Sequence, residues 1–128
     1  GARFLVSPGA TPRLLDAARA WPVPFLPGIS TASEAMSAME LGFNQLKFFP
    51  AEASGGRAML RSLNGPFPDL RFCPTGGIDA TGASAYLALP NVLCVGGSWL
   101  APARLMQDSL WGEITRLASA AAQLPRNG

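Results

Sequence analysis

The sequence predicts an α/β domain of parallel strands covered by helices, arranged as part of a (β/α)8 TIM barrel. Short apolar runs recur about every 20 to 26 residues, and each ends at a glycine, proline or serine. Each run is followed by a loop and then by a segment with helical spacing, the alternation expected of a parallel sheet covered by helices. The repeat length suits an eight-fold barrel, and glycine-rich loops follow the last two runs, where such barrels hold phosphate.

Five runs are expected to form strands: residues 3–7, 23–26, 45–49, 71–74 and 92–95. Eight strands close a barrel, whereas five leave two exposed edges and inward side chains with nothing opposite them. An open doubly wound sheet would remove this difficulty, but such sheets usually carry their glycine signature after the first strand. The position of the glycine-rich loops therefore favours the barrel.

The helices between these runs have recognisable starts. The first begins after Thr11, where a proline follows the capping residue, and the second begins after Thr31, where Glu34 completes a capping box. Further helices are expected at residues 56–63, at 80–89 and after a cap at Asp108. The helical side chains expected to face the core are Ala35, Met36, Met39, Trp111, Ile114, Leu117, Ala118 and Ala121.

The composition predicts one packed domain over residues 1–128, because 48% of the residues are hydrophobic and only 14% are charged. The net charge of +2 is small and the arginines are scattered, so no basic stripe for nucleic acid is expected. No apolar run approaches the roughly 18 residues of a membrane span, and the first residues do not resemble a signal peptide. We therefore expect a cytoplasmic protein that binds neither nucleic acid nor membrane.

Cys73 and Cys94 lie in separate strand-like runs without the paired spacing of a zinc or redox site, and the chain has no histidine. We expect both to be buried thiols rather than a disulfide. Without histidine, any catalytic base must be a carboxylate, a tyrosine, a water molecule or a group outside this chain. No metal ion or organic cofactor is expected.

Lysine is almost absent from this chain. Of its 10 cationic side chains only Lys47 is a lysine, and it stands in the apolar run Leu46-Lys47-Phe48-Phe49-Pro50. An amine that loses its proton can attack a carbonyl carbon, which a guanidinium cannot do, and apolar neighbours raise the fraction of free amine. Lys47 is therefore the candidate nucleophile for Schiff-base chemistry. A lysine whose stem packs while its ammonium reaches water would fit the same pattern.

The two glycine-rich loops are Pro74-Thr75-Gly76-Gly77-Ile78 and Val95-Gly96-Gly97-Ser98-Trp99. Consecutive glycines let backbone N–H groups approach an anion closely, a following helix start adds partial positive charge, and a serine offers a hydroxyl. The loops predict a phosphate site at Gly76, Gly77, Gly97 and Ser98, with simple tight turns as the alternative.

Essentially the whole chain resembles the family of 2-keto-3-deoxy-6-phosphogluconate (KDPG) aldolases, also described as 4-hydroxy-2-oxoglutarate aldolases. The matching stretches are Ser7-Pro8-Gly9, Pro27-Gly28-Ile29-Ser30-Thr31, Lys47-Phe48-Phe49-Pro50-Ala51-Glu52, Gly65-Pro66-Phe67-Pro68, Arg71-Phe72-Cys73-Pro74-Thr75-Gly76-Gly77 and Gly96-Gly97-Ser98-Trp99. The resemblance implies that Lys47 is the Schiff-base lysine of a class I aldolase (a lyase) and that the glycine loops bind phosphate. It also implies that Pro8, Phe49 and Thr75 line the substrate pocket.

The same resemblance implies a substrate, a pathway and an assembly. The substrate would be a phosphorylated 2-keto acid, cleaved without a cofactor to pyruvate and glyceraldehyde 3-phosphate. The reaction would belong to the Entner-Doudoroff pathway of carbohydrate metabolism. Family members assemble as homotrimers, whereas an open five-strand sheet could instead pair its edges with another copy of the chain.

The chain departs from the family at its start. Family members carry three more strand-helix units before the one that begins at Arg3, so this chain resembles the last five. The missing units hold the glutamate that acts as general acid and base, and an arginine and a threonine that bind the pyruvate carboxylate. Glu52 is the available substitute, although its place before a helix start suits a structural role equally well. A phosphate-binding half-barrel without catalysis is one alternative, and a relative of thiamin-phosphate synthase, which leaves Lys47 without a role, is another.

Overall fold

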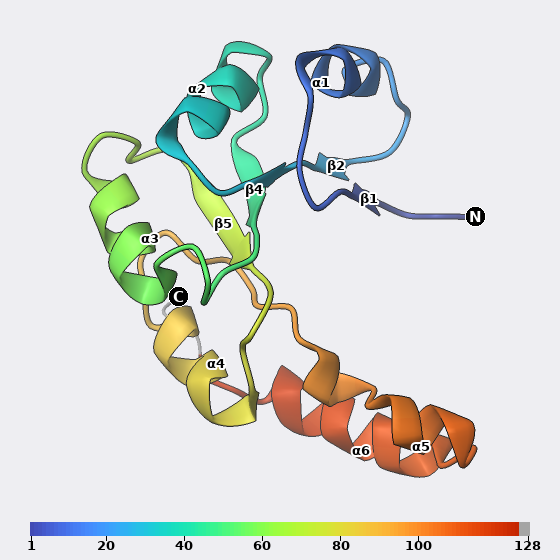
Figure 1. The fold of residues 1–128 in the computed structure, drawn as a ribbon. Coiled ribbons are helices and arrows are strands. Elements are labelled where there is room, and N and C mark those ends of the chain that lie inside the picture. Colours follow the sequence, from blue (N-terminus) through green and yellow to red (C-terminus); the bar gives the residue numbers. More distant parts are fainter. Residues whose placement is uncertain (126–128) are drawn as a thin grey trace.

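The computed structural model describes residues 1–125, which form six α-helices, one short 3₁₀ helix and five strands. In chain order they are β1 (Leu5–Val6), α1 (Pro12–Ala18), β2 (Phe25–Leu26), β3 (Gly28–Ile29), α2 (Ala32–Glu40), β4 (Gln45–Phe48), α3 (Gly56–Asn64), β5 (Arg71–Pro74), α4 (Ala80–Leu87), η1 (Ser98–Leu100), α5 (Ala103–Gln107) and α6 (Trp111–Ala122). A helix follows each of β1, β3, β4 and β5, as Figure 1 shows.

All strands pair in parallel, which confirms the α/β class, but they form two sheets. β1 pairs with β2, and β4 is the central strand between β3 and β5. Pro27 separates β2 from β3, so one extended run pairs first with β1 and then with β4. Proline has no backbone N–H to donate to a neighbouring strand. The change of partner strand therefore falls at a residue that could not continue the hydrogen bonding of a strand.

The fifth predicted strand, residues 92–95, is not a regular strand. Two isolated parallel bridges, Phe72 to Val92 and Thr75 to Gly96, carry the sheet past β5. Between the bridges, the β5 side has two residues and the other side has three, so an extra residue interrupts the ladder. The segment therefore lies beside β5 without forming a continuous strand.

The sheet is fully buried on one face. Leu46 and Phe48 of β4 and Phe72 of β5 have no exposed surface. The helices contribute Leu15, Ala35, Ala38, Leu60, Leu63, Ala83, Tyr86 and Leu87 to the same core. Because successive side chains of a strand point to opposite faces, Lys47 and Cys73 lie on the other face, where both are half-buried. Cys94 is exposed, so the predicted burial of the two cysteines is wrong.

The predicted caps of α1 and α2 are confirmed. The Thr11 hydroxyl accepts a hydrogen bond from the Leu14 N–H at 3.2 Å, and the Thr31 hydroxyl accepts one from the Glu34 N–H at 3.3 Å. The Glu34 carboxylate in turn accepts the N–H groups of Ser30 at 2.8 Å and Thr31 at 2.9 Å, which completes the capping box. These hydrogen bonds, the one from Ser30 above all, lower the pKa of Glu34.

The C-terminal helices differ from the prediction. Trp111 is 59% exposed and Met36, on α2, is 52% exposed, so neither is a core residue. Ala118 is exposed as well, and no residue of α6 is fully buried. Asp108 is the C-cap of α5, while α6 begins after Leu110 without a side-chain cap.

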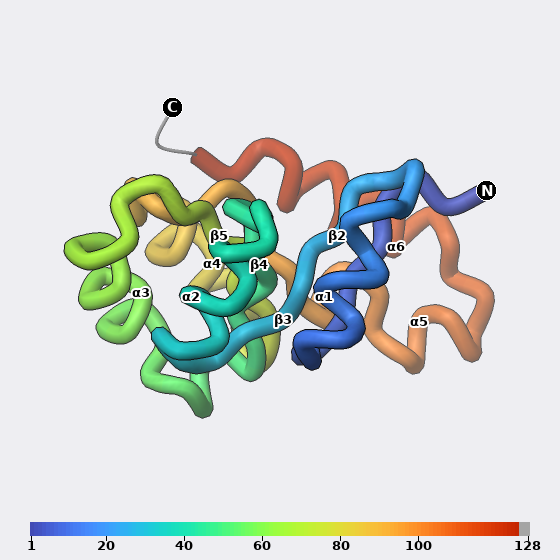
Figure 2. The backbone as a smooth tube through the Cα atoms, turned by 90° about the horizontal axis from the view of Figure 1, so that it is seen from above, coloured from blue at the N-terminus to red at the C-terminus, as the bar shows by residue number. Residues whose placement is uncertain are grey.

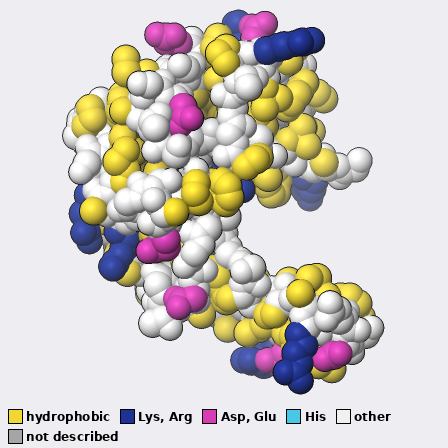
Figure 3. All heavy atoms as spheres, viewed as in Figure 1, with side chains coloured by type: hydrophobic (Ala, Val, Ile, Leu, Met, Phe, Trp, Pro, Cys, Tyr) yellow, Lys and Arg dark blue, Asp and Glu magenta, His cyan; other side chains and the backbone are white. Residues whose placement is uncertain are grey.

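The placement of α5 and α6 explains their exposure. They project from the body on the same side as the N-terminus (Figures 1 and 2). The molecule is hollowed between them and its N-terminal half (Figure 3). α6 packs mainly on η1 and α5, so most of its surface meets no sheet. The apolar side chains that recur along α6 at helical spacing therefore have little apolar surface to pack against.

The two sheets meet at Gly28, where the backbone of Ser7 and Pro8 passes very close. A Cβ atom at Gly28 would stand 2.3 Å from the carbonyl carbon of Pro8 and 2.5 Å from the carbonyl oxygen of Ser7. Only glycine leaves room for this contact. Since Gly28 is also the register partner of Lys47, the approach brings Pro8 beside the strand that carries the lysine.

A second contact links the segments after β4 and β5. The buried hydroxyl of Tyr86, on α4, donates a hydrogen bond to the Glu52 carboxylate, and the Glu52 N–H donates to the carbonyl oxygen of Gly76 at 3.1 Å. A Cβ atom at Gly77 would stand 2.8 Å from the Cβ of Glu52, so the glycine lies directly against this side chain. Glu52 thus connects the glycine loop after β5 to α4.

Titration of Tyr86 provides a test of this contact, because Tyr86 is the only tyrosine in the chain and tyrosinate absorbance reports on it alone. Burial, and then the hydrogen bond and charge of Glu52, raise the pKa of Tyr86. We expect a native midpoint well above the ordinary value of about 10, and a midpoint near 10 in urea. Because the folded pKa is raised, the stability this hydroxyl contributes is present below about pH 10 and is lost as the pH rises through the folded pKa.

The Glu52→Gln variant should lower the native midpoint, since it removes the carboxylate charge beside the hydroxyl. Glu40→Gln, which alters an exposed carboxylate on α2, is the matched control and should leave the midpoint where it is. Equal midpoints in the parent chain and in Glu52→Gln would contradict the contact.

Candidate functional site

Lys47 lies on the central strand of the three-stranded sheet. Its backbone N–H donates to the carbonyl oxygen of Pro27 at 2.8 Å, and its register partners are Gly28 on β3 and Cys73 on β5. The amino nitrogen stands 4.6 Å from the centroid of the Phe49 ring, a cation–π distance. Within residues 1–125 Lys47 forms no ion pair. The lysine is therefore fixed at its backbone, with its amine beside an aromatic ring rather than a carboxylate.

The segments that follow β4 and β5 stay paired beyond the strand ends. The Thr75 N–H donates to the carbonyl oxygen of Phe48 at 2.9 Å, and the Ala51 N–H donates to that of Thr75 at 2.8 Å. Gly76 and Gly77 have φ angles of 104° and 78°, the left-handed region that favours glycine. A Cβ atom at Gly76 would also stand 3.2 Å from the Phe49 ring. The glycine loop is therefore held against the ring that borders Lys47.

An open pocket of about 940 Å³ lies between the two glycine-rich loops. It is lined by Thr75, Gly76, Gly77, Ile78, Asp79, Gly97, Ser98, Trp99, Pro102 and Ala103. Five of the predicted substrate-binding residues line this pocket together: Thr75, Gly76, Gly77, Gly97 and Ser98. Phe49 lies against Gly76, at the edge of the pocket. Pro8 and Lys47 do not line the pocket.

The pocket walls contain unused backbone donors. In the described part of the chain, the N–H groups of Gly76, Gly77, Gly97 and Ser98 donate to no other protein group. The Gly96 N–H, by contrast, donates to the carbonyl oxygen of Pro74 at 3.0 Å. Available N–H groups from two facing loops are suited to binding an anion.

The start of α4 differs from the expectation that it would lend positive charge to an anion. The Asp79 carboxylate caps this helix by accepting the Gly82 N–H at 2.7 Å, so a negative group already occupies the helix start. Trp99 was also not anticipated in this site. A Cβ atom at Gly97 would stand 1.7 Å from the Trp99 ring, so glycine is required there by a side chain rather than by a turn. The Asp-x-x-Gly spacing at the start of α4 indicates the cap. The sequence places Trp99 in the second glycine-rich loop but does not indicate that its ring packs against Gly97.

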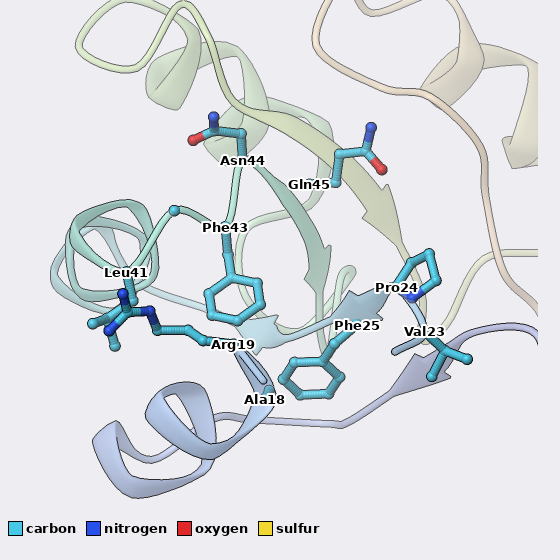
Figure 4. A pocket seen from close by; sticks show the side chains of 10 residues that line it. Ala18, Arg19, Val23, Pro24, Phe25, Leu41, Phe43, Asn44 and Gln45 are labelled. Carbon is cyan, nitrogen blue, oxygen red and sulfur yellow. The ribbon is translucent and has the colours of Figure 1, made fainter. Parts of the chain in front are cut away.

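A second pocket, of about 520 Å³, lies at the opposite ends of the strands (Figure 4). It opens beside Gln45, the first residue of β4, and contains Phe25 and Phe43, whose ring centroids are 5.9 Å apart. Its one charged lining residue, Arg19, pairs with Asp16 at 3.5 Å. None of the predicted functional residues lines this pocket. The loop pocket beside β4 and β5 is therefore the candidate site.

Residues 1–125 contain neither a metal-binding cluster nor a membrane-spanning helix. No group of three or more Cys, Asp or Glu side chains there is arranged to hold a metal ion. None of the helices in that part of the chain is both long enough and apolar enough to cross a membrane.

Comparison with known proteins places this site in context. The model of the family "KDPG and KHG aldolase" matches residues 1–117. The 2-dehydro-3-deoxy-phosphogluconate aldolase of Pseudoalteromonas atlantica is 51% identical over 121 residues, which cover 94% of this chain and 56% of that protein. The KHG/KDPG aldolase of Escherichia coli is 50% identical over 123 residues, which cover 96% of this chain and 58% of that protein.

Solved structures agree with the sequence relatives. KDPG aldolase from Legionella pneumophila, with pyruvate captured as a covalent carbinolamine, superposes with a TM-score of 0.92 at 47% identity and covers 94% of this chain and 59% of that one. The enzyme from Zymomonas mobilis with 3-phosphoglycerate gives 0.89 at 43% identity, covering 98% and 59%. This chain therefore spans somewhat more than half the length of these relatives. The chain belongs to the KDPG and KHG aldolase family.

Proposed function

We propose that this chain is the lysine-bearing part of a class I aldolase that cleaves KDPG to pyruvate and glyceraldehyde 3-phosphate. The observation that carries the proposal is the position of Lys47, on the central strand and next to the loop that lines the pocket with unused N–H donors. The carbinolamine in the Legionella pneumophila relative, which is 47% identical, supports imine chemistry with pyruvate. The 3-phosphoglycerate in the Zymomonas mobilis relative supports a phosphorylated ligand.

The chemistry follows from the amine. Neutral Lys47 attacks the C2 ketone of the sugar acid to give a carbinolamine, which loses water to become an iminium ion. A general base takes the proton of the C4 hydroxyl, the C3–C4 bond breaks and its electron pair passes to the iminium, which leaves an enamine and releases the aldehyde. Protonation of the enamine and hydrolysis then release pyruvate and regenerate the lysine. Within residues 1–125 no carboxylate pairs with the amine, and Phe49 covers one side of it.

The remaining residues would bind the substrate. We assign the phosphate to the N–H groups of Gly76, Gly77 and Gly97 and to Ser98, whose side chain is exposed. Binding energy from this remote group would position the sugar acid for the chemical step. Thr75 would lie between the phosphate and the lysine, because it lines the pocket and is the residue directly after β5. Pro8 would border the open side of Lys47 through its contact with Gly28.

We further propose that residues 1–128 are the last five units of a (β/α)8 barrel, in a single incomplete domain. The parallel strands, the two unpaired edges at β1 and at residues 92–96, and coverage of only 56% to 58% of curated relatives support this interpretation. The general base would then belong to a segment outside this chain, because Glu52 is bound by Tyr86. A cytoplasmic location, expected from the sequence, and trimeric assembly, implied by the family resemblance, are part of the same proposal.

A half-barrel that binds phosphate without catalysis is the second candidate function. The unused N–H groups of the pocket favour it, because they would bind an anion whether or not a base stands near Lys47. The two predictions that follow distinguish it from the aldolase.

Pyruvate should form a reducible imine on Lys47. Treatment of the chain with pyruvate and borohydride, followed by peptide mass spectrometry, is expected to find one reduced adduct at this residue. The Lys47→Arg variant is the matched control and should carry none, since a guanidinium does not form the imine but preserves the positive charge. An adduct confined to the N-terminal amine of Gly1 would contradict the assignment.

The isolated chain should have little aldolase activity. Positioned acid–base catalysis contributes about 10² to 10⁴ in rate, so loss of the base should lower turnover by at least this range. Fusing the chain to the part of the Escherichia coli relative that this chain does not cover should restore pyruvate release in a coupled lactate dehydrogenase assay. If instead the isolated chain turns over at the rate of the fusion and Glu52→Gln abolishes it, Glu52 is the base.

A further inference from the structure

Two cysteines follow Lys47 in a row across the sheet, on the β5 side, and the aldolase chemistry has no use for them. Cys73 on β5 is the register partner of Lys47. Cys94 lies in the neighbouring segment, between the bridges that join Phe72 to Val92 and Thr75 to Gly96. The two side chains form a hydrogen bond, and both are thiols. Two sulfur atoms on adjacent extended segments thus face each other beside an amine.

The backbone spacing allows these sulfurs to join. Neighbouring strands lie about 4.8 Å apart. Disulfides span Cα separations of roughly 4.4 to 6.8 Å. The extra residue between the two bridges puts Cys94 at the middle of its segment, opposite Cys73 and Pro74 of β5. A disulfide would therefore need no separation of β5 from the 92–96 segment.

We propose that Cys73 and Cys94 form a peroxide-sensitive dithiol in which Cys73 is the reacting thiol and Cys94 resolves it. The Cys73 thiolate attacks one oxygen of hydrogen peroxide, the O–O bond breaks, and hydroxide leaves a sulfenic acid on Cys73. The Cys94 thiolate then attacks this sulfur, a second hydroxide leaves, and the disulfide forms. Two thiols lose two electrons to one peroxide molecule, which becomes two molecules of water once the thiol protons are counted.

The surroundings of Cys73 favour its thiolate at neutral pH. The hydrogen bond with Cys94 lowers the pKa of Cys73 to about 7, with help from the Thr75 hydroxyl 3.9 Å away and the positive charge of Lys47, and against the opposing effect of burial. Arg71, two residues earlier on β5, is turned to the carbonyl oxygens of Pro68 and Leu70. Lys47 and Cys94 are therefore the ionisable groups that act on Cys73.

The expected gain in reactivity is moderate. At pH 7 about half of Cys73 would be thiolate, against roughly 3% of an ordinary thiol with a pKa of about 8.5. Intrinsic nucleophilicity falls as the pKa falls, with a Brønsted slope of about 0.4 to 0.5. The two effects together predict that Cys73 reacts roughly three- to four-fold faster than an ordinary thiol at this pH.

The test uses the intact reduced chain and hydrogen peroxide. After brief exposure to a small excess of peroxide at pH 7 and a quench with N-ethylmaleimide, intact-mass and peptide mapping should find a monomer that has lost two hydrogens and binds no maleimide. The Cys94→Ser variant should stop at a sulfenic acid on Cys73, which dimedone captures. The Cys73→Ser variant should retain its Cys94 thiol at the same dose. A circular-dichroism spectrum equal to that of the parent verifies folding in both variants.

Three outcomes would overturn the proposal. They are disulfide-linked dimers without the internal bond, equal oxidation of Cys94 in Cys73→Ser and in the parent, and a parent chain that retains both thiols under these conditions. The inference does not rest on imine formation. Lys47→Arg retains the positive charge and should still form the disulfide, so a chain that fails the pyruvate test can pass this one.

Discussion

The fold depends on β4, a four-residue strand that is paired on both sides and covered by helices on one face. Leu46 and Phe48 are completely buried, so the residue between them must point the other way. A register shift of one residue would drive the ammonium of Lys47 into that core, and burying an unpaired charge costs several kcal/mol. The same hydrophobic alternation that builds the sheet therefore fixes the direction of the lysine.

The pairing also determines where the pocket lies. Hydrogen bonds from Thr75 to Phe48, and from Ala51 and Glu52 back to the segment after β5, continue the contact past the ends of both strands. The glycine-rich loop after β5 consequently lies at the same end of the sheet as Phe49. The aromatic pocket at the other end is lined by none of the residues predicted to bind phosphate. Binding capacity is thus concentrated at the carboxyl ends of the strands, as in other parallel α/β folds.

Local signals in the sequence were sufficient for much of this arrangement. Thr31 and Glu34 cap α2 as predicted because capping is decided within four residues, and the apolar alternation located β4 and β5. Long-range contacts were beyond such signals. Trp111 has an apolar side chain at helical spacing, but its burial depended on a partner surface that α6 does not have in this structure. Asp79 and Trp99, by contrast, enter the candidate site through short-range contacts with Gly82 and Gly97, and only the cap at Asp79 has a recognisable sequence signal.

At Gly28, where the two sheets meet, the geometry around Lys47 depends on the size of a residue rather than on its functional group. The two sheets touch there backbone to backbone, with 2.3 Å between the Pro8 carbonyl carbon and the place where a side chain would begin. Any larger residue at Gly28 would clash with the backbone after β1 and push β1 and Pro8 away from the central sheet. The approach of Pro8 to the strand beside Lys47 is therefore set by the absence of a side chain at Gly28, a residue with no reactive group. A single methyl group at this position would displace Pro8 from that strand without changing any functional group of the site.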